Sequence, residues 1–239
     1  MTNIRRYDAI NRPVFMTAVC SKRHPHLAGD ENKQLLLSVI REIKHEKPFA
    51  MLGYVILDDH FHWMIQLPRG GMSGNPQKTG NTLTYNNMGK THLSGRYASH
   101  PALTYDSTTN IDARRSGCDQ RELPDNRIPH NAAPTSKYSI SEIMQSVKLR
   151  FTHRYKKSHG INGNVSIWQR RFWDHIARDQ GDINRHLDYI HYNPVKHGHA
   201  AKPLDYRFSS FSKYVELEIY PPDWGATEEP VNLSEVTWE

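Results

Sequence analysis

Hydrophobic residues recur along the chain with periods that predict four strands. Residues 13–20, PVFMTAVC, form a short β-branched and aromatic run, which favours a strand. Residues 51–59 and 60–68 have the same character and indicate two further strands with a tight connection near Asp59. Residues 167–178, IWQRRFWDHIAR, alternate in polarity and are rich in aromatic residues, which predicts the fourth strand.

Three segments carry apolar residues at helical spacing instead. The first covers about residues 30–47, and Asp30 is expected to cap it. The second covers residues 139–157 and has a basic outer face. The third covers residues 182–193 and is expected to stop at Pro194, because a residue before proline disfavours helical dihedrals. The order β-α-β-β-α-β-α, with the helices on one face of an antiparallel sheet, predicts a ferredoxin-like α+β fold.

One long segment, residues 70–136, shows neither period. It is rich in Gly, Asn, Thr, Ser and Pro and has few large apolar residues, so it cannot bury a core. A loop of this length is unusual inside a compact domain, and we expect a disordered insertion. The chain is therefore expected to form one domain over residues 1–225, interrupted by this insert, followed by an acidic tail over residues 226–239.

Charge is segregated along the 239 residues. The formal net charge is +6, which favours a polyanionic partner. Residues 137–178 hold nine basic and two acidic residues, whereas residues 215–239 hold seven acidic residues and no basic one. The basic block favours nucleic-acid binding over a merely solvated face. No apolar run reaches the roughly 18 residues of a spanning helix, so we expect a soluble cytoplasmic protein without a membrane partner.

Two pairs of residues carry the candidate chemistry. His60 and His62 flank Phe61, and the strand period of two directs both imidazoles to one face, as in half of a metal site. Such a pair also arises by chance in a chain with 15 histidines. Tyr189 and Asn193 are four apart and share one helix face. From spacing alone, Asn193 is either a third ligand or a helix cap, and Tyr189 is either a nucleophile or a core tyrosine.

This set of groups would suit attack on a phosphodiester. Two neutral imidazoles and an amide leave the charge of a divalent cation undiminished, so it would polarise a phosphoryl oxygen. A nearby cation also favours ionisation of a phenol, the step that makes tyrosine nucleophilic. Attack would form a phosphotyrosine link, free a 3′ hydroxyl and allow the strands to be rejoined. Mg²⁺ or Mn²⁺ suits such a site, although imidazole would also accept zinc.

These residues resemble a known family. The two histidines and the phenylalanine between them look like the His-hydrophobic-His metal motif of single-tyrosine HUH transposases. Residues 168–173, WQRRFW, and 188–196, DYIHYNPVK, closely resemble the REP-associated tyrosine transposases. The resemblance covers residues 1–68 and 139–225, and the long insert after Pro68 departs from the shorter connection of other members.

The resemblance implies the ferredoxin-like HUH transposase fold, with Mg²⁺ or Mn²⁺ held by His60, His62 and Asn193 and with Tyr189 as nucleophile. It implies an endonuclease and strand transferase, a monomer or homodimer, acting on single-stranded DNA with palindromic hairpins through a 5′-phosphotyrosine. The alternative is a catalytically silent hairpin-binding protein of the same fold. A zinc hydrolase using only the histidines is a weaker third hypothesis.

The residues expected to contact DNA lie in the N-terminal arm, the second helix and the fourth strand. They are Arg5, Arg6, Lys148, Arg150, Arg154, Lys156, Lys157, Arg170 and Arg171. Trp168, Phe172 and Trp173 either stack on bases or belong to the core. The acidic tail either competes with DNA for the basic face or only keeps the protein soluble, and truncation after Tyr214 is expected to separate the two.

Overall fold

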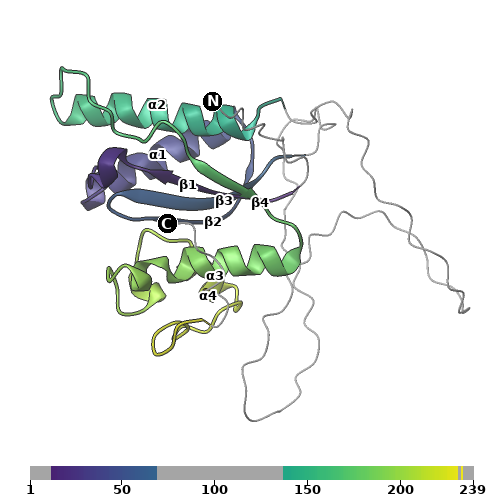
Figure 1. Ribbon diagram of the computed structural model, residues 1–239. Coiled ribbons are helices and arrows are strands. Elements are labelled where there is room, and N and C mark those ends of the chain that lie inside the picture. The colour runs from purple at the N-terminus through teal and green to yellow at the C-terminus, as the bar shows by residue number, and fades with distance from the viewer. Residues whose placement is uncertain (1–11, 69–136, 231–232, 234–239) are drawn as a thin grey trace, which may run out of the picture.

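The computed structural model describes residues 12–68, 137–230 and 233 (Figure 1). The expected insert at residues 70–136 and part of the expected tail at residues 226–239 lie outside the described residues. Among the helices that the structure describes, none has the length and apolar character needed to cross a membrane.

A four-stranded antiparallel sheet forms the centre of the molecule, in the order β2-β3-β1-β4. Two helices, α1 and α2, connect its strands in the order β-α-β-β-α-β. The bounds are β1 (Val14–Val19), α1 (Asp30–Glu46), β2 (Ala50–Ile56), β3 (His60–Gln66), α2 (Ile140–Ser158) and β4 (Trp173–Ile176). This strand order and connectivity are ferredoxin-like, so the predicted fold class is confirmed.

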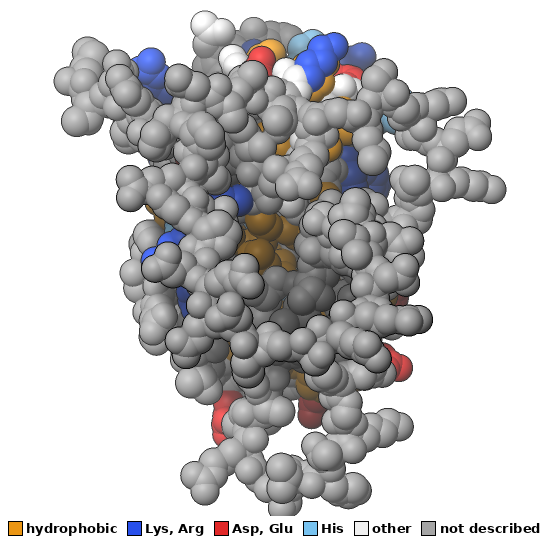
Figure 2. Space-filling model, turned by 90° about the vertical axis from the view of Figure 1, so that its right-hand side faces the viewer, with side chains coloured by type: hydrophobic (Ala, Val, Ile, Leu, Met, Phe, Trp, Pro, Cys, Tyr) orange, Lys and Arg blue, Asp and Glu red, His pale blue; other side chains and the backbone are white. Residues whose placement is uncertain are grey.

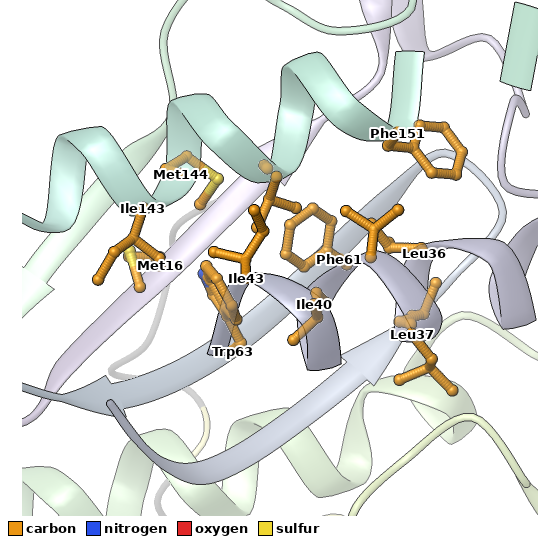
Figure 3. Close-up of a cluster of buried hydrophobic side chains, with 14 of the residues drawn as sticks. Met16, Leu36, Leu37, Ile40, Ile43, Phe61, Trp63, Ile143, Met144 and Phe151 are labelled. Atoms are coloured by element: carbon orange, nitrogen blue, oxygen red, sulfur yellow. The ribbon is translucent and has the colours of Figure 1, made fainter. Parts of the chain in front are cut away.

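The two faces of the sheet receive alternate side chains of each strand. On β3, Phe61 and Trp63 point toward α1 and α2 and are fully buried among apolar side chains such as Ile40 and Met144 (Figure 3). His62, between them in the chain, points to the opposite face. A single strand therefore supplies a hydrophobic core on one side and imidazoles on the other.

The opposite face is covered by α3 (Gln180–Lys196) and α4 (Phe211–Glu216), which lie across the sheet from α1 and α2 (Figure 1). The prediction that all helices share one face is therefore wrong for the last one. Leu187 of α3 packs against β2, where a Cβ atom on Gly53 would lie 2.7 Å from Leu187 Cδ2. The glycine thus allows the helix to approach the sheet closely.

The helix boundaries differ from the prediction in two places. Asp30 is not the cap of α1, because Gly29, with φ of 82°, holds that position and the Asp30 carboxylate pairs with Arg207 at 2.7 Å. Helix α3 does not stop at Pro194 but continues to Lys196. Because Pro194 lies in the last turn, its missing N–H costs only one hydrogen bond near the helix end. Ser139 does cap α2, through a capping box with Glu142.

The predicted fourth strand is much shorter than residues 167–178 and spans only Trp173–Ile176. Trp168 instead forms an isolated bridge with Cys20, and its ring is buried against Phe61. Its role is therefore that of a core residue. The arginine-rich stretch between the bridge and β4 runs outside the regular sheet, which turns these residues toward solvent.

The segment after α4 belongs to the core of the α3 face. Ile219 and Tyr220 are buried there, and Leu233 is only 6% exposed. A truncation after Tyr214 would remove these buried side chains along with the acidic ones. It cannot therefore separate an electrostatic role of the tail from a structural one, and point substitutions are needed instead.

Candidate active site

The two histidines of β3 are held in place by neighbours on either side. His62 lies opposite Thr17 of β1, and the threonine Oγ1 is 2.7 Å from His62 Nδ1. His60 Nδ1 is 2.5 Å from the Asp59 carboxylate. Both histidines are at most 1% exposed, and their ring centroids lie 4.8 Å apart. Each Nδ1 is engaged by an orienting group, so Nε2 is the nitrogen of each ring placed to coordinate a metal.

The carboxylate beside His60 is stabilised as an anion. The hydrogen bond with His60, reinforced by Arg23 at 3.1 Å, lowers the pKa of Asp59 to about 2, although partial burial opposes this. A carboxylate on Nδ1 favours the tautomer in which that nitrogen carries the proton, which leaves the lone pair on Nε2. Asp59 therefore orients the His60 ring and favours one tautomer.

Helix α3 brings its polar stripe onto the same histidines. The Tyr189 ring packs edge-on against His62 with a centroid distance of 5.2 Å. Two turns later, the ring of His197, the C-cap of α3, lies 5.2 Å from His60. Asn193 lies four residues after Tyr189 and four residues before His197, and it is 0% exposed. It therefore lies on the helix face that meets the histidine pair, between the two residues whose rings contact the histidines.

Phe15 of β1 organises the rings around this point. It stacks on His62 at 5.5 Å and lies 4.8 Å from His186, and it meets the edge of Tyr189 at 6.0 Å. These contacts fix the orientation of His62 and Tyr189 relative to each other.

A buried polar pair on the far side of α3 supports Tyr189. The hydroxyl of Tyr220 donates a hydrogen bond to the buried carboxylate of Asp188, the residue before Tyr189. Burial raises the pKa of Tyr220 well above its ordinary value, so this phenol remains protonated and donating. His191 Nε2 lies 2.9 Å from Ser210 Oγ, and burial lowers the His191 pKa to about 3. Buried hydrogen-bond partners thus set the rotation of the helix that carries Tyr189.

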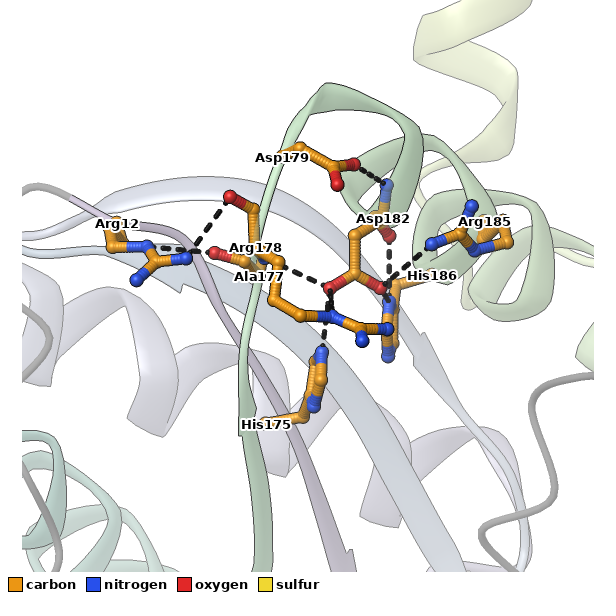
Figure 4. Close-up of polar contacts among 8 residues, drawn as sticks. All are labelled: Arg12, His175, Ala177, Arg178, Asp179, Asp182, Arg185 and His186. Carbon is orange, nitrogen blue, oxygen red and sulfur yellow. Dashed lines mark hydrogen bonds and ion pairs between the residues drawn. The ribbon is translucent and has the colours of Figure 1, made fainter.

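A second cluster joins the start of α3 to β4 (Figure 4). Ligand atoms of His175, Asp182 and His186 lie within 4.8 Å of one another, close enough for a metal ion. The Asp182 carboxylate, however, already lies 2.8 Å from His175 Nε2 and accepts two hydrogen bonds from Arg178. Arg185 lies 3.5 Å from its other oxygen. Because two guanidinium groups occupy the surroundings of this carboxylate, the cluster acts as a structural cross-link between strand and helix.

Several residues expected to contact DNA are paired within the molecule. Arg150 and Arg154 form ion pairs across the helices with Glu46 and Glu42, each at 2.7 Å. Lys148 donates hydrogen bonds to two backbone carbonyls of the loop before β4, at 2.9 and 3.3 Å. These three residues link α2 to its neighbours, so binding phosphate would require them to share or exchange partners.

The remaining basic residues are more accessible. Lys157, Arg170 and Arg171 are exposed and Lys156 is half-buried, whereas Arg5 and Arg6 lie outside the described residues. On the face in Figure 2, lysine and arginine side chains lie mostly in the upper half, and the described charged side chains along the lower edge are acidic.

The site also contains residues that the sequence motifs did not identify. Asp59 directly precedes the histidine pair, and its position beside His60 could have been noted from the sequence. His197 follows Asn193 at the same helical spacing as Asn193 follows Tyr189. Thr17 had no such signal, because only the register of β1 against β3 brings it to His62.

A ferredoxin-like sheet that presents a histidine pair to a tyrosine on a later helix has the features attributed above to single-tyrosine HUH transposases. The chain is 56% identical over 225 residues to a protein described as a REP-associated tyrosine transposase of Haemophilus influenzae, covering 94% of each chain. It is 38% identical over 224 residues to the REP-associated tyrosine transposase of Escherichia coli, covering 94% of this chain and 91% of that one. This chain therefore belongs to the REP-associated tyrosine transposase family.

A solved structure of a REP-associated tyrosine transposase bound to a REP hairpin shares the fold, with a TM-score of 0.58 and 24% identity. The match covers 95% of this chain and 94% of that one. No family model matches the chain.

Proposed function

We propose that this protein cleaves and rejoins single-stranded DNA at palindromic hairpins, with Tyr189 as the nucleophile. The observation that carries the proposal is the packing of the Tyr189 ring against His62, 5.2 Å between centroids, on the face where Asn193 is also buried. A tyrosine in an ordinary apolar core would not require two oriented histidines and a buried amide beside it.

The donor set fits Mg²⁺ or Mn²⁺. Two imidazoles oriented through their Nδ1 atoms and a buried amide are neutral ligands that hold a cation without reducing its charge. We propose His60, His62 and Asn193 as these ligands. A bound divalent ion would supply electrostatic stabilisation of the negative charge that develops on the phosphoryl oxygens.

The chemical step that we propose is a phosphoryl transfer to the tyrosine. The Tyr189 oxygen forms a bond to phosphorus while the bond from phosphorus to the 3′ oxygen breaks, and the electron pair stays on that oxygen. The phenolic proton passes to solvent, and the released 3′ oxygen takes up a proton from solvent. The product is a 5′-phosphotyrosine link and a free 3′ hydroxyl, and the reverse attack by a 3′ hydroxyl rejoins strands.

Exclusion of water favours this transfer over hydrolysis. Tyr189 is 2% exposed, and the Tyr220–Asp188 pair and Phe15 hold its helix and its ring. A preorganised phenol surrounded by protein needs little reorganisation when the phosphate arrives. These residues therefore position the nucleophile and shield the covalent link.

Hairpin DNA is the partner that we propose, because a relative of the same fold was solved bound to a REP hairpin. The exposed cations Lys157, Arg170 and Arg171 and the half-buried Lys156 would contact its phosphates. Lys148, Arg150 and Arg154 are proposed as further contacts, formed when their present partners are exchanged for phosphate. Such contacts predict binding that weakens steeply with salt.

The test is a search for the covalent intermediate. The protein is incubated with 5′- and 3′-labelled single-stranded oligonucleotides that contain the host's palindromic repeats, in the presence of Mn²⁺. We expect a denaturation-resistant protein–DNA adduct that is lost with chelator and with Tyr189→Phe. Tyr192→Phe is the matched control, because Tyr192 lies on the same helix and packs toward Trp224 instead.

The other outcomes identify the competing functions. Gel-shifted complexes without an adduct under any divalent metal would favour a catalytically silent hairpin-binding protein. Cleavage by Tyr189→Phe supported by zinc would favour a hydrolase that uses the histidines alone.

A further inference from the structure

Lys196 lies directly beside the proposed nucleophile. It is the last residue of α3 and follows Tyr189 by seven residues, which is two helical turns on the same face. Its Nζ donates toward the Tyr189 hydroxyl at 3.5 Å and lies 4.9 Å from the centre of the phenol ring. An ammonium group thus covers both the ring and the oxygen of the tyrosine.

This placement differs from that of the other basic residues near the sheet. Tyr189 is 2% exposed, whereas Lys196 is exposed to solvent. A phosphate that approaches Tyr189 from solvent therefore meets the ammonium group beside it. The basic residues of α2 cannot take this part, because α2 covers the opposite face of the sheet (Figure 1).

We propose that Lys196 is a further catalytic residue, whose ammonium group binds a non-bridging oxygen of the scissile phosphate. The inference rests on the proposed function of Tyr189. An attacking oxygen approaches phosphorus to about 3–3.5 Å before bond formation. The non-bridging oxygens are one bond further on, so a cation 3.5 Å from the same phenol oxygen lies within reach of them.

The role of Lys196 in the step is that of a fixed positive charge. The bond from Tyr189 to phosphorus forms, the bond to the 3′ oxygen breaks, and both protons exchange with solvent as described above. Lys196 keeps its proton throughout and forms no covalent bond. Its ammonium stabilises the negative charge that accumulates on the equatorial oxygens in the transition state. This interaction is stronger in the transition state than in the ground state, so it lowers the barrier.

The experiment compares adduct formation by Lys196→Met, Lys196→Arg and Lys213→Met with that of the wild-type protein. Lys213→Met removes the same charge from an exposed position on α4 and serves as the matched control. Rates are measured with saturating hairpin oligonucleotide and Mn²⁺, and affinity for the oligonucleotide is measured separately by fluorescence anisotropy with chelator. Melting temperatures show whether each variant is folded.

We expect Lys196→Met to form the adduct about 100- to 1,000-fold more slowly, the usual effect of removing one charge-stabilising donor. Its DNA affinity should change no more than that of Lys213→Met. Lys196→Arg keeps the positive charge and should form the adduct about tenfold faster than Lys196→Met. A purely structural role of the side chain would not produce this difference.

Two results would overturn the inference, and each is distinct from failure of the proposed function. A wild-type rate for Lys196→Met would do so, as would equal rates for the arginine and methionine variants. In both cases the loss of the adduct with Tyr189→Phe would leave the nucleophile assignment standing. An adduct formed by Tyr189→Phe would instead remove the proposed function and the role of Lys196 with it.

Discussion

The two faces of the central sheet differ in chemistry although the same strands build both. Toward α1 and α2, buried residues of β1 and β3 such as Met16, Phe61 and Trp63 are apolar. Toward α3, the same strands bury Thr17, His60 and His62 beside Tyr189. Because side chains alternate with a period of two, the same strands bury an apolar core toward α1 and α2 and, toward α3, polar groups beside a second apolar cluster that includes Phe15 and Leu57.

Several polar groups that are buried on the α3 face are held by specific orienting contacts. On the α3 face, histidine Nδ1 atoms meet Thr17 and Asp59, and the Asp188 carboxylate accepts a hydrogen bond from Tyr220. Each such contact offsets part of the desolvation cost of the group that it holds. The face that carries the candidate chemistry is therefore the more demanding one to assemble.

The largest expected effect is on stability, and it distinguishes Phe61 from His62, its neighbour on β3 that points to the opposite face. Phe61→Ala should lower the free energy of unfolding by about 3–5 kcal/mol, because it leaves a cavity in a fully buried core. His62→Ala should lower it less but abolish the covalent adduct. Urea unfolding and the adduct assay measure the two properties. Equal losses of stability in the two variants would contradict the expectation that Phe61 contributes more to folding than His62.

A smaller effect is expected where α3 approaches the sheet. Gly53→Ala should destabilise the protein by about 1–3 kcal/mol, because the new Cβ would lie 2.7 Å from Leu187 Cδ2 and must displace it. Gly163→Ala is the matched control, since nothing lies within 4 Å of a Cβ at that position. Thermal or urea unfolding checks both. Identical stability of the two variants would contradict close packing of α3 on β2.

The cross-link at the start of α3 should respond to pH. Burial raises the pKa of Asp182, but hydrogen bonds from His175 and Arg178 outweigh it and hold that pKa well below its ordinary value. This stabilisation is present above the unfolded pKa of about 4 and is lost as the pH falls further toward the folded pKa. Asp182→Asn should cost about 1.5 kcal/mol at pH 7, the value of one hydrogen bond to a charged group.

The measurement for Asp182 is unfolding by urea at a series of pH values from neutral to acid. The stability of the asparagine variant should decline less steeply below pH 4 than that of the wild-type protein. Parallel curves would mean that the carboxylate is not the group linking β4 and α3.

The smallest effect concerns the α1/α2 face and its arginines. Glu42→Gln releases Arg154 from its ion pair, so the arginine becomes available for phosphate. We expect hairpin DNA to bind about threefold more tightly at low salt, with the gain shrinking as salt is added. Glu31→Gln removes the same charge from the same helix and is the control. An equal gain in both variants would reflect net charge alone, not the release of Arg154.

Much of this arrangement was predictable because local patterns carry it. The β-branched and aromatic runs located β1, β2 and β3 to within a few residues, and the helical spacing of apolar residues located the start of α2 near residue 139. The histidine pair and the Tyr189–Asn193 spacing identified the elements that meet, although their roles in catalysis stay predictions. The predicted boundaries at Asp30, Pro194 and the fourth strand were wrong. Asp30 pairs with Arg207 instead of capping α1, α3 continues past Pro194 to Lys196, and Trp168 bridges to Cys20 outside β4.

The sequence by itself determined the ferredoxin-like order of elements and the family, because both rest on periodicity and on short contiguous motifs. Only the tertiary structure decided that α3 lies on the face opposite α1 and α2. An amphipathic stripe specifies that a helix packs, but not against which of two apolar faces. Likewise, the contacts of Thr17 with His62 and of Tyr220 with Asp188 join residues 45 and 32 positions apart. Such pairs depend on strand register and chain reversal, which no local pattern encodes.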